Sequence, residues 1–159
     1  MIAFQRFVLE NGLRVLVHED QSTPMAVVNV LYDVGARDEH PDQTGFAHLF
    51  EHLMFGGSVN IPDYDEPLQR AGGENNAYTT NDLTNYYCQI PAENIETAFW
   101  LESDRMLSLA FSEKSLEVQR KVVCEEFKEH YLNKPYGDAW NKIREMAYKK
   151  HPYKWMTIG

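Results

Sequence analysis

The chain has 159 residues, of which 43% are hydrophobic and 13% aromatic, a composition that fits a globular protein and excludes a disordered one. Its 24 acidic residues outnumber 15 Lys and Arg, giving a net charge of -9 without a basic stripe, so nucleic acid is not an expected partner. No stretch approaches the roughly 20 apolar residues that a membrane span requires.

The N-terminal residues, Met1 to Phe7, lack the apolar stretch of a secretory signal. We therefore expect a cytoplasmic protein, or a periplasmic one if a signal has been removed. Cys88 and Cys124 form no Cys-x-x-Cys motif, so neither a disulfide framework nor a cysteine zinc site is expected.

The first third of the chain has the pattern of three strands followed by a helix. Residues 4–10 and 13–19 flank Asn11-Gly12, the strongest short signal for a hairpin, and alternation in the second segment predicts a half-buried strand. Residues 25–34 are dense in β-branched side chains and predict a central strand. After a loop, Gly45 precedes a helix that Gly56 and Gly57 end.

The remaining elements mix strands and helices without regular βαβ units. We predict a short helix over 62–71, adjacent strands over 74–81 and 83–90, and helices over 91–109, 113–133 and 136–149. This order indicates an α+β fold, a two-layer sandwich of helices on a mainly antiparallel sheet. We interpret residues 1–159 as one domain, cut at its C-terminal end and belonging to a longer multi-domain chain.

The segment His48-Leu-Phe-Glu-His52 carries the candidate chemistry. At about 100° per residue on a helix, His48 and His52 lie about 40° apart, and Glu51 lies about 60° to the other side of His48. Two imidazoles at this spacing can hold zinc, and an adjacent carboxylate can accept a proton from the water that the metal binds. Apolar neighbours, including Phe46 and Phe50, are expected to bury the rest of the helix. Paired helical histidines also occur as ordinary polar groups, so these residues alone leave metal binding open.

A tetrahedral zinc site needs a third protein ligand, and a cluster of glutamates in the 113–133 helix offers candidates. Glu126 lies about 90° from the centre of the helix's apolar stripe, whereas Glu125 and Glu129 lie about 150° or more away. Periodicity therefore favours Glu126 at the edge of the buried face and solvent for the other two. A fully solvated acidic face remains the alternative.

Several stretches together resemble the insulinase and pitrilysin family of zinc metallopeptidases, whose zinc signature His-x-x-Glu-His reverses the commoner order. The resemblance implies that His48, His52 and Glu126 bind one zinc ion and that Glu51 is the general base. Many relatives carry an acid where this chain has Gln119, so the tuning of the site is in question. The similar stretches cover most of the chain, namely residues 9–15, 34–39, 45–58, 72–79 and 120–126.

The family resemblance implies a zinc metalloendopeptidase that hydrolyses extended peptides or small unfolded proteins, with Glu51 activating the zinc-bound water. Asn76, Ala77 and Tyr78 are similar to the family's substrate-binding strand, which pairs with a peptide as an added strand. The family also implies a second half, on the same chain or a partner subunit, without which this piece would cleave poorly. The alternative is a non-catalytic, substrate-presenting subunit that pairs with an active partner.

Overall fold

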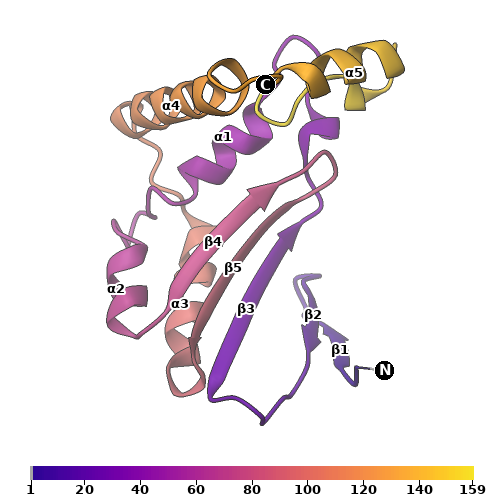
Figure 1. Cartoon of the computed structure of the whole chain (residues 1–159). Helices are drawn as coiled ribbons and strands as arrows, with labels where there is room; N and C mark the ends of the chain where they lie inside the picture. The colour runs from indigo at the N-terminus through magenta and orange to yellow at the C-terminus, as the bar shows by residue number, and fades with distance from the viewer. Residues whose placement is uncertain (1) are drawn as a thin grey trace.

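The computed structural model describes residues 2–159 as an antiparallel sheet with helices packed against it (Figure 1). The strands are β1 (Gln5–Val8), β2 (Arg14–Val17), β3 (Met25–Tyr32), β4 (Glu74–Thr79) and β5 (Thr84–Pro91). The α-helices are α1 (Phe46–Leu53), α2 (Asp65–Arg70), α3 (Ile95–Leu107), α4 (Glu113–Phe127) and α5 (Ala139–Ala147). The predicted α+β fold with a helical layer on an antiparallel sheet is confirmed. Within residues 2–159, no helix has both the length and the apolar character needed to cross a membrane.

The main sheet has the strand order β3-β5-β4, and both pairs are antiparallel. β5 is the central strand, since its Tyr86, Cys88 and Ile90 are at most 2% exposed. β3 alternates exposed and partly buried residues, the pattern of a strand covered on one face. The prediction that β3 is central was therefore wrong for the described residues, because β-branched side chains indicate a strand but not its position within a sheet.

The predicted N-terminal hairpin is present as a separate two-stranded sheet, β1 and β2. Gly12 has φ 88°, a left-handed conformation that glycine adopts without steric cost and that the tight turn requires. Half-burial of the second strand was wrong, because only Val15 of its four residues is partly buried. Apolar residues do alternate along this strand, but few side chains of residues 2–159 cover its apolar face.

The core lies between the sheet and helices α2 and α3. Leu68 of α2 and Ala98 and Leu101 of α3 pack against Cys88 and Ile90 of β5, and all five are at most 1% exposed. Burying a leucine or isoleucine side chain, as at Leu68, Leu101 and Ile90, contributes about 1.5–3 kcal/mol relative to leaving it exposed. This cluster fixes β5, and through it the neighbouring β4, relative to the helices.

A buried ion pair in α3 extends the core toward α1. The Nη2 of Arg105 donates to Oε1 of Glu102 over 2.5 Å, and the Tyr64 hydroxyl donates to the same oxygen over 2.6 Å. The Arg105 guanidinium carbon lies 4.5 Å from the ring centres of both Tyr64 and Tyr86, within cation–π range. Burial, reinforced by the Glu102 charge, raises the pKa of Tyr64, so its hydroxyl stays protonated and remains a donor. Tyr86 thus packs against the guanidinium group of Arg105.

Candidate functional site

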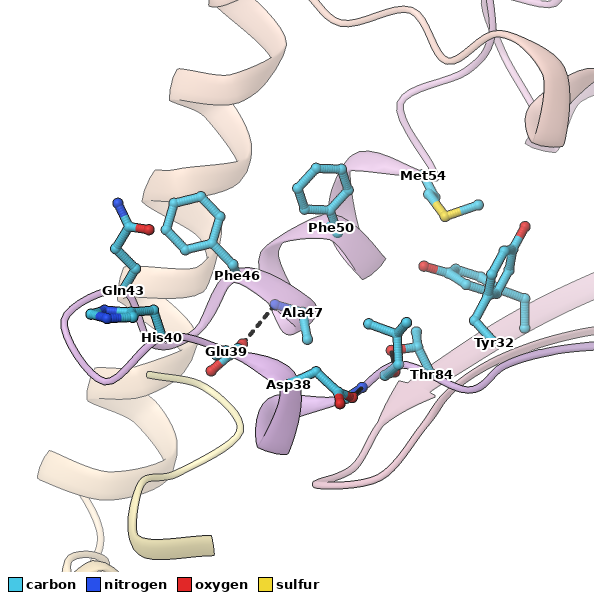
Figure 2. Close-up of a pocket in the computed structure, with 13 residues that line it drawn as sticks. Tyr32, Asp38, Glu39, His40, Gln43, Phe46, Ala47, Phe50, Met54 and Thr84 are labelled. Carbon is cyan, nitrogen blue, oxygen red and sulfur yellow. Dashed lines mark hydrogen bonds between the residues drawn. The ribbon is translucent and has the colours of Figure 1, made fainter. Parts of the chain in front are cut away.

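Helix α1 is placed by contacts at its N-terminus. Gly45 precedes it with φ 89°, and a Cβ there would lie 2.7 Å from the carbonyl oxygen of Ile158, so only glycine fits. The carboxylate of Glu39 accepts hydrogen bonds from the N–H groups of Gly45, over 2.9 Å, and Ala47, over 2.8 Å. Figure 2 shows the second of these bonds. An anion at this position satisfies otherwise unpaired N–H groups and complements the helix dipole.

His48 and His52 point from α1 toward Glu126 on α4. The Glu126 Oε2 atom lies 3.7 Å from Nε2 of His48 and 3.4 Å from Nε2 of His52. Ligand atoms on a tetrahedral zinc ion lie about 3.4 Å apart, because Zn–N and Zn–O bonds are about 2.1 Å long. One ligand atom from each of the three residues lies within 4.8 Å of the other two. The two nitrogens and one carboxylate oxygen therefore fit zinc in both chemistry and spacing.

The environment of His48 favours the form that binds metal. Its side chain is only 13% exposed, and this burial lowers the pKa of the His48 imidazole; the nearby His52 lowers it further, while Glu126 opposes both effects. A lowered pKa keeps His48 neutral at neutral pH, and only the neutral imidazole has a lone pair to donate.

The candidate glutamates at the end of α4 and in the π-helical turn that follows it, Lys128–Leu132, have separate environments. Glu126 is partly buried, whereas Glu125 and Glu129 are exposed, in agreement with the periodicity of the helix. Glu125 forms a surface ion pair with Lys128 at 2.7 Å. The second oxygen of Glu126, Oε1, lies 3.7 Å from Nδ1 of His130, too long for a hydrogen bond. Glu126 is thus the one glutamate of the three that faces α1.

Glu51 lies in α1 beside the two histidines and faces β4. It is 9% exposed, and its Oε2 accepts a hydrogen bond from the hydroxyl of Thr79. The sequence drew no attention to Thr79, because a threonine in a strand is ordinary and its partner is 28 residues away. Only the folded topology, which sets β4 against α1, could reveal this contact.

Asn76, Ala77 and Tyr78 lie in β4, at one edge of the three-stranded sheet. The Oδ1 atom of Asn76 accepts a hydrogen bond from the N–H of Ala77 over 2.8 Å, and Tyr78 is 49% exposed. Gln119, on α4, is partly buried. Its side chain forms no hydrogen bond to another residue within residues 2–159.

The opposite side of α1 lines a cavity of about 430 Å³ between the helix and the sheet. Phe46, Phe50 and Met54 face it from α1, and Tyr32 and Thr84 from the sheet (Figure 2). Phe46 is 48% and Phe50 44% exposed, so the expectation that they are buried was wrong for the described residues. Helical periodicity identified the apolar side of α1 correctly but could not show what covers it.

Comparison with known proteins relates this arrangement to a peptidase family. The sequence model of the insulinase family, peptidase family M16, matches residues 14–159. The chain is 36% identical to a protein named zinc protease PqqE from Helicobacter pylori over 154 residues, which are 95% of this chain and 35% of that protein. It is 30% identical to the mitochondrial-processing peptidase subunit beta of Saccharomyces cerevisiae, over 95% of this chain and 33% of that protein.

A solved structure has the same fold. The crystal structure of a protease from Helicobacter pylori matches with a TM-score of 0.94 at 34% identity, covering 100% of this chain and 39% of that one. The chain thus spans well under half the length of the relatives it matches.

Proposed function

This chain belongs to the insulinase family, peptidase family M16, and from that membership we propose that it is the zinc-binding part of a metalloendopeptidase. The observation that carries the proposal is the convergence of His48, His52 and Glu126 at ligand spacing, with Glu51 beside them on the same helix. These four residues supply three metal ligands and one group able to move a proton.

In this proposal, His48 and His52 of α1 and Glu126 of α4 hold the zinc ion. When bound, zinc lowers the pKa of a water molecule toward about 7 and polarises the carbonyl group of a substrate. Glu51 would accept a proton from the attacking water and would then deliver it to the departing amine of the substrate. The low exposure of Glu51 keeps bulk water from competing for the proton.

The proposed substrates are extended peptides or small unfolded proteins. Within residues 2–159, β4 has a neighbour in the sheet on one side only, and an edge strand can hydrogen-bond a peptide as an additional strand. The N–H of Ala77 is held by the Asn76 side chain, which would have to rotate away for that N–H to pair with a peptide. Recognition through the backbone would accept peptides with little sequence in common.

We also propose that a second half, on the same chain or a partner subunit, completes the enzyme. The relatives named above are between two and three times as long as this chain. One relative is named as a subunit of a mitochondrial-processing peptidase, so a role as one subunit of a paired enzyme is also possible for this chain. The competing proposal is that this chain presents substrate to an active partner.

The test is Glu51→Gln in the full-length native protein, assayed with an internally quenched fluorogenic peptide. The variant should keep one zinc ion per chain while kcat falls by about 10²–10⁴-fold, because the proton acceptor is lost and the ligands are not. Glu129→Gln is the matched control. Glu129 is exposed and lies one helical turn after Glu126, so the same change of side chain there should leave kcat unchanged. Full activity of Glu51→Gln would refute the assignment. A wild-type protein that binds zinc without cleaving any peptide would favour the substrate-presenting role.

A further inference from the structure

We propose that Thr79 is a positioning residue that orients Glu51 for proton transfer. The inference rests on the proposed function, in which Glu51 is the general base. The Thr79 hydroxyl donates to Oε2 of Glu51, across the contact between β4 and α1. A threonine hydroxyl has one proton to donate, so this bond holds one carboxylate oxygen.

Glu51 needs such a partner for two reasons. A carboxylate that is 9% exposed has lost most of its hydration and is costly to bury without a hydrogen bond. The last torsion of a glutamate side chain also has broad preferences, so packing alone does not fix the carboxylate plane. Within residues 2–159 no hydrogen bond to Oε1 of Glu51 is found, and that oxygen is left to exchange a proton.

Thr79 is itself held firmly, so it can set the position of another group. Its β-branched side chain restricts χ1, and it pairs with Thr84 in the register of β4 and β5. The turn that follows is closed by the Thr80 hydroxyl oxygen, which accepts from the N–H groups of Asp82 and Leu83 at 3.1 Å each. The end of β4 therefore has little freedom to move.

Two segments that are distant in the sequence also hold this turn in place through hydrogen bonds. The backbone N–H of Ala36 donates to Thr80 O at 3.1 Å, and a Cβ on Gly35 would lie 2.6 Å from Asn81 O, so glycine permits this close approach. From the C-terminal segment, Arg144 Nη1 donates to Asn81 Oδ1 at 3.1 Å, and the Tyr153 hydroxyl donates to Asp82 Oδ1 at 2.5 Å. These contacts fix the position from which the Thr79 hydroxyl reaches Glu51.

The arrangement ties the peptide-binding strand to the proton acceptor. Thr79 directly follows Asn76, Ala77 and Tyr78 in β4, so a peptide paired with that strand would lie in a fixed register relative to Glu51. Because Thr79 acts through Glu51 and not on the substrate, its loss should lower kcat and leave KM unchanged.

The experiment compares Thr79→Val, Thr79→Ser and Thr84→Val in the zinc-loaded, full-length native protein with the same fluorogenic peptide. Thr79→Val keeps the shape and removes the hydroxyl, and we expect kcat to fall about tenfold, as loss of one hydrogen bond to a charged group predicts. KM and zinc content should stay near wild type, Tm should fall because the buried Glu51 carboxylate loses its hydrogen bond, and Thr79→Ser should restore both kcat and Tm. Thr84→Val is the control, since its hydroxyl donates to Val34 O and not to Glu51.

Wild-type kcat in Thr79→Val would overturn the proposal, as would an equal loss in Thr84→Val or a failure of Thr79→Ser to restore activity. If Thr79→Val does not fold, Thr79→Ala replaces it in the same comparison. Glu51→Gln distinguishes failure of the proposed function from failure of the role proposed for Thr79. If that variant is active, the proposed function fails; if it is inactive while Thr79→Val is fully active, only the role of Thr79 fails.

Discussion

At the scale of single residues, Glu126 differs from its neighbour Glu125 in direction and not in chemistry. Glu126 reaches two imidazole nitrogens at 3.4 and 3.7 Å, whereas Glu125 pairs with Lys128 in solvent. A turn of about 100° along one helix therefore separates a candidate metal ligand from a surface acid.

We predict that Glu126→Ala raises the zinc dissociation constant by at least about 100-fold, the upper end of the effect that even an outer-shell partner has. Competition with a chromophoric chelator measures this constant. Glu125→Ala should leave it unchanged. Equal affinities in the two variants would show that the zinc takes its third ligand from elsewhere.

The relative placement of residues could be predicted where it depends on a single helix. His48, Glu51 and His52 share one helix, so their relative directions follow from helical geometry, and the periodicity of α4 selected Glu126. Thr79 could not be predicted in the same way, because its role depends on how β4 is placed against α1. The buried pair of Glu102 and Arg105 was missed as well, since charges three residues apart usually lie on a solvated helix surface.

At the scale of elements, α4 is less firmly anchored in the core than α3. None of its residues is buried, whereas α3 has Ala98, Leu101, Glu102 and Arg105 in the interior. A zinc ion shared by α1 and α4 would therefore supply a large part of what holds α4 in place.

We predict that removing zinc with a chelator increases amide hydrogen exchange in α4 much more than in α3. With free zinc at 100 times its dissociation constant, binding stabilises the attached state by about 2.7 kcal/mol, so protection in α4 should fall about 100-fold. Exchange measured by mass spectrometry on peptides from the two helices makes the comparison. A uniform change in both helices would mean that the metal stabilises the whole fold and not this attachment.

Most element positions were predictable, and the differences have physical causes. Glycines at both ends of α1 and the strand pattern around Asn81 placed these segments within a few residues. The predicted helix over 113–133 is α4 followed by a π-helical turn, Lys128–Leu132, a change that hydrophobic spacing does not reveal. The edge position of β3 was also beyond prediction, because sheet order depends on contacts between distant segments.

At the scale of the whole molecule, the site depends on residues from most of the chain. Trp155 donates from its indole nitrogen to Ala36 O at 2.7 Å, a contact between residues 119 positions apart. Together with Arg144 and Tyr153, it holds the C-terminal segment against the turn that ends β4. Figure 1 shows α5 and the chain end near this turn, and Gly159 lies against Gly45 at the start of α1.

We predict that residues 1–159 alone bind one zinc ion per chain but cleave a fluorogenic peptide with a kcat/KM about 10²-fold below that of the full-length native protein. The ligands are all present, but substrate contacts expected from a second half are not, and imprecise placement of a substrate has an effect of this size. Zinc content and initial rates at equal zinc loading measure the difference. Equal rates would show that this part is sufficient for catalysis.

Within residues 2–159 β4 lies at an edge of its sheet, and if this edge binds substrates as proposed, it determines which proteins such an enzyme could cleave. In a folded protein the backbone N–H and C=O groups already form hydrogen bonds with each other. Such a protein has no free extended segment to pair with β4 and would not be cleaved. Cleaved signal peptides, misfolded chains and the products of other proteases do have free extended segments. Such an enzyme would select its substrates by their lack of folded structure, and folded proteins would resist cleavage.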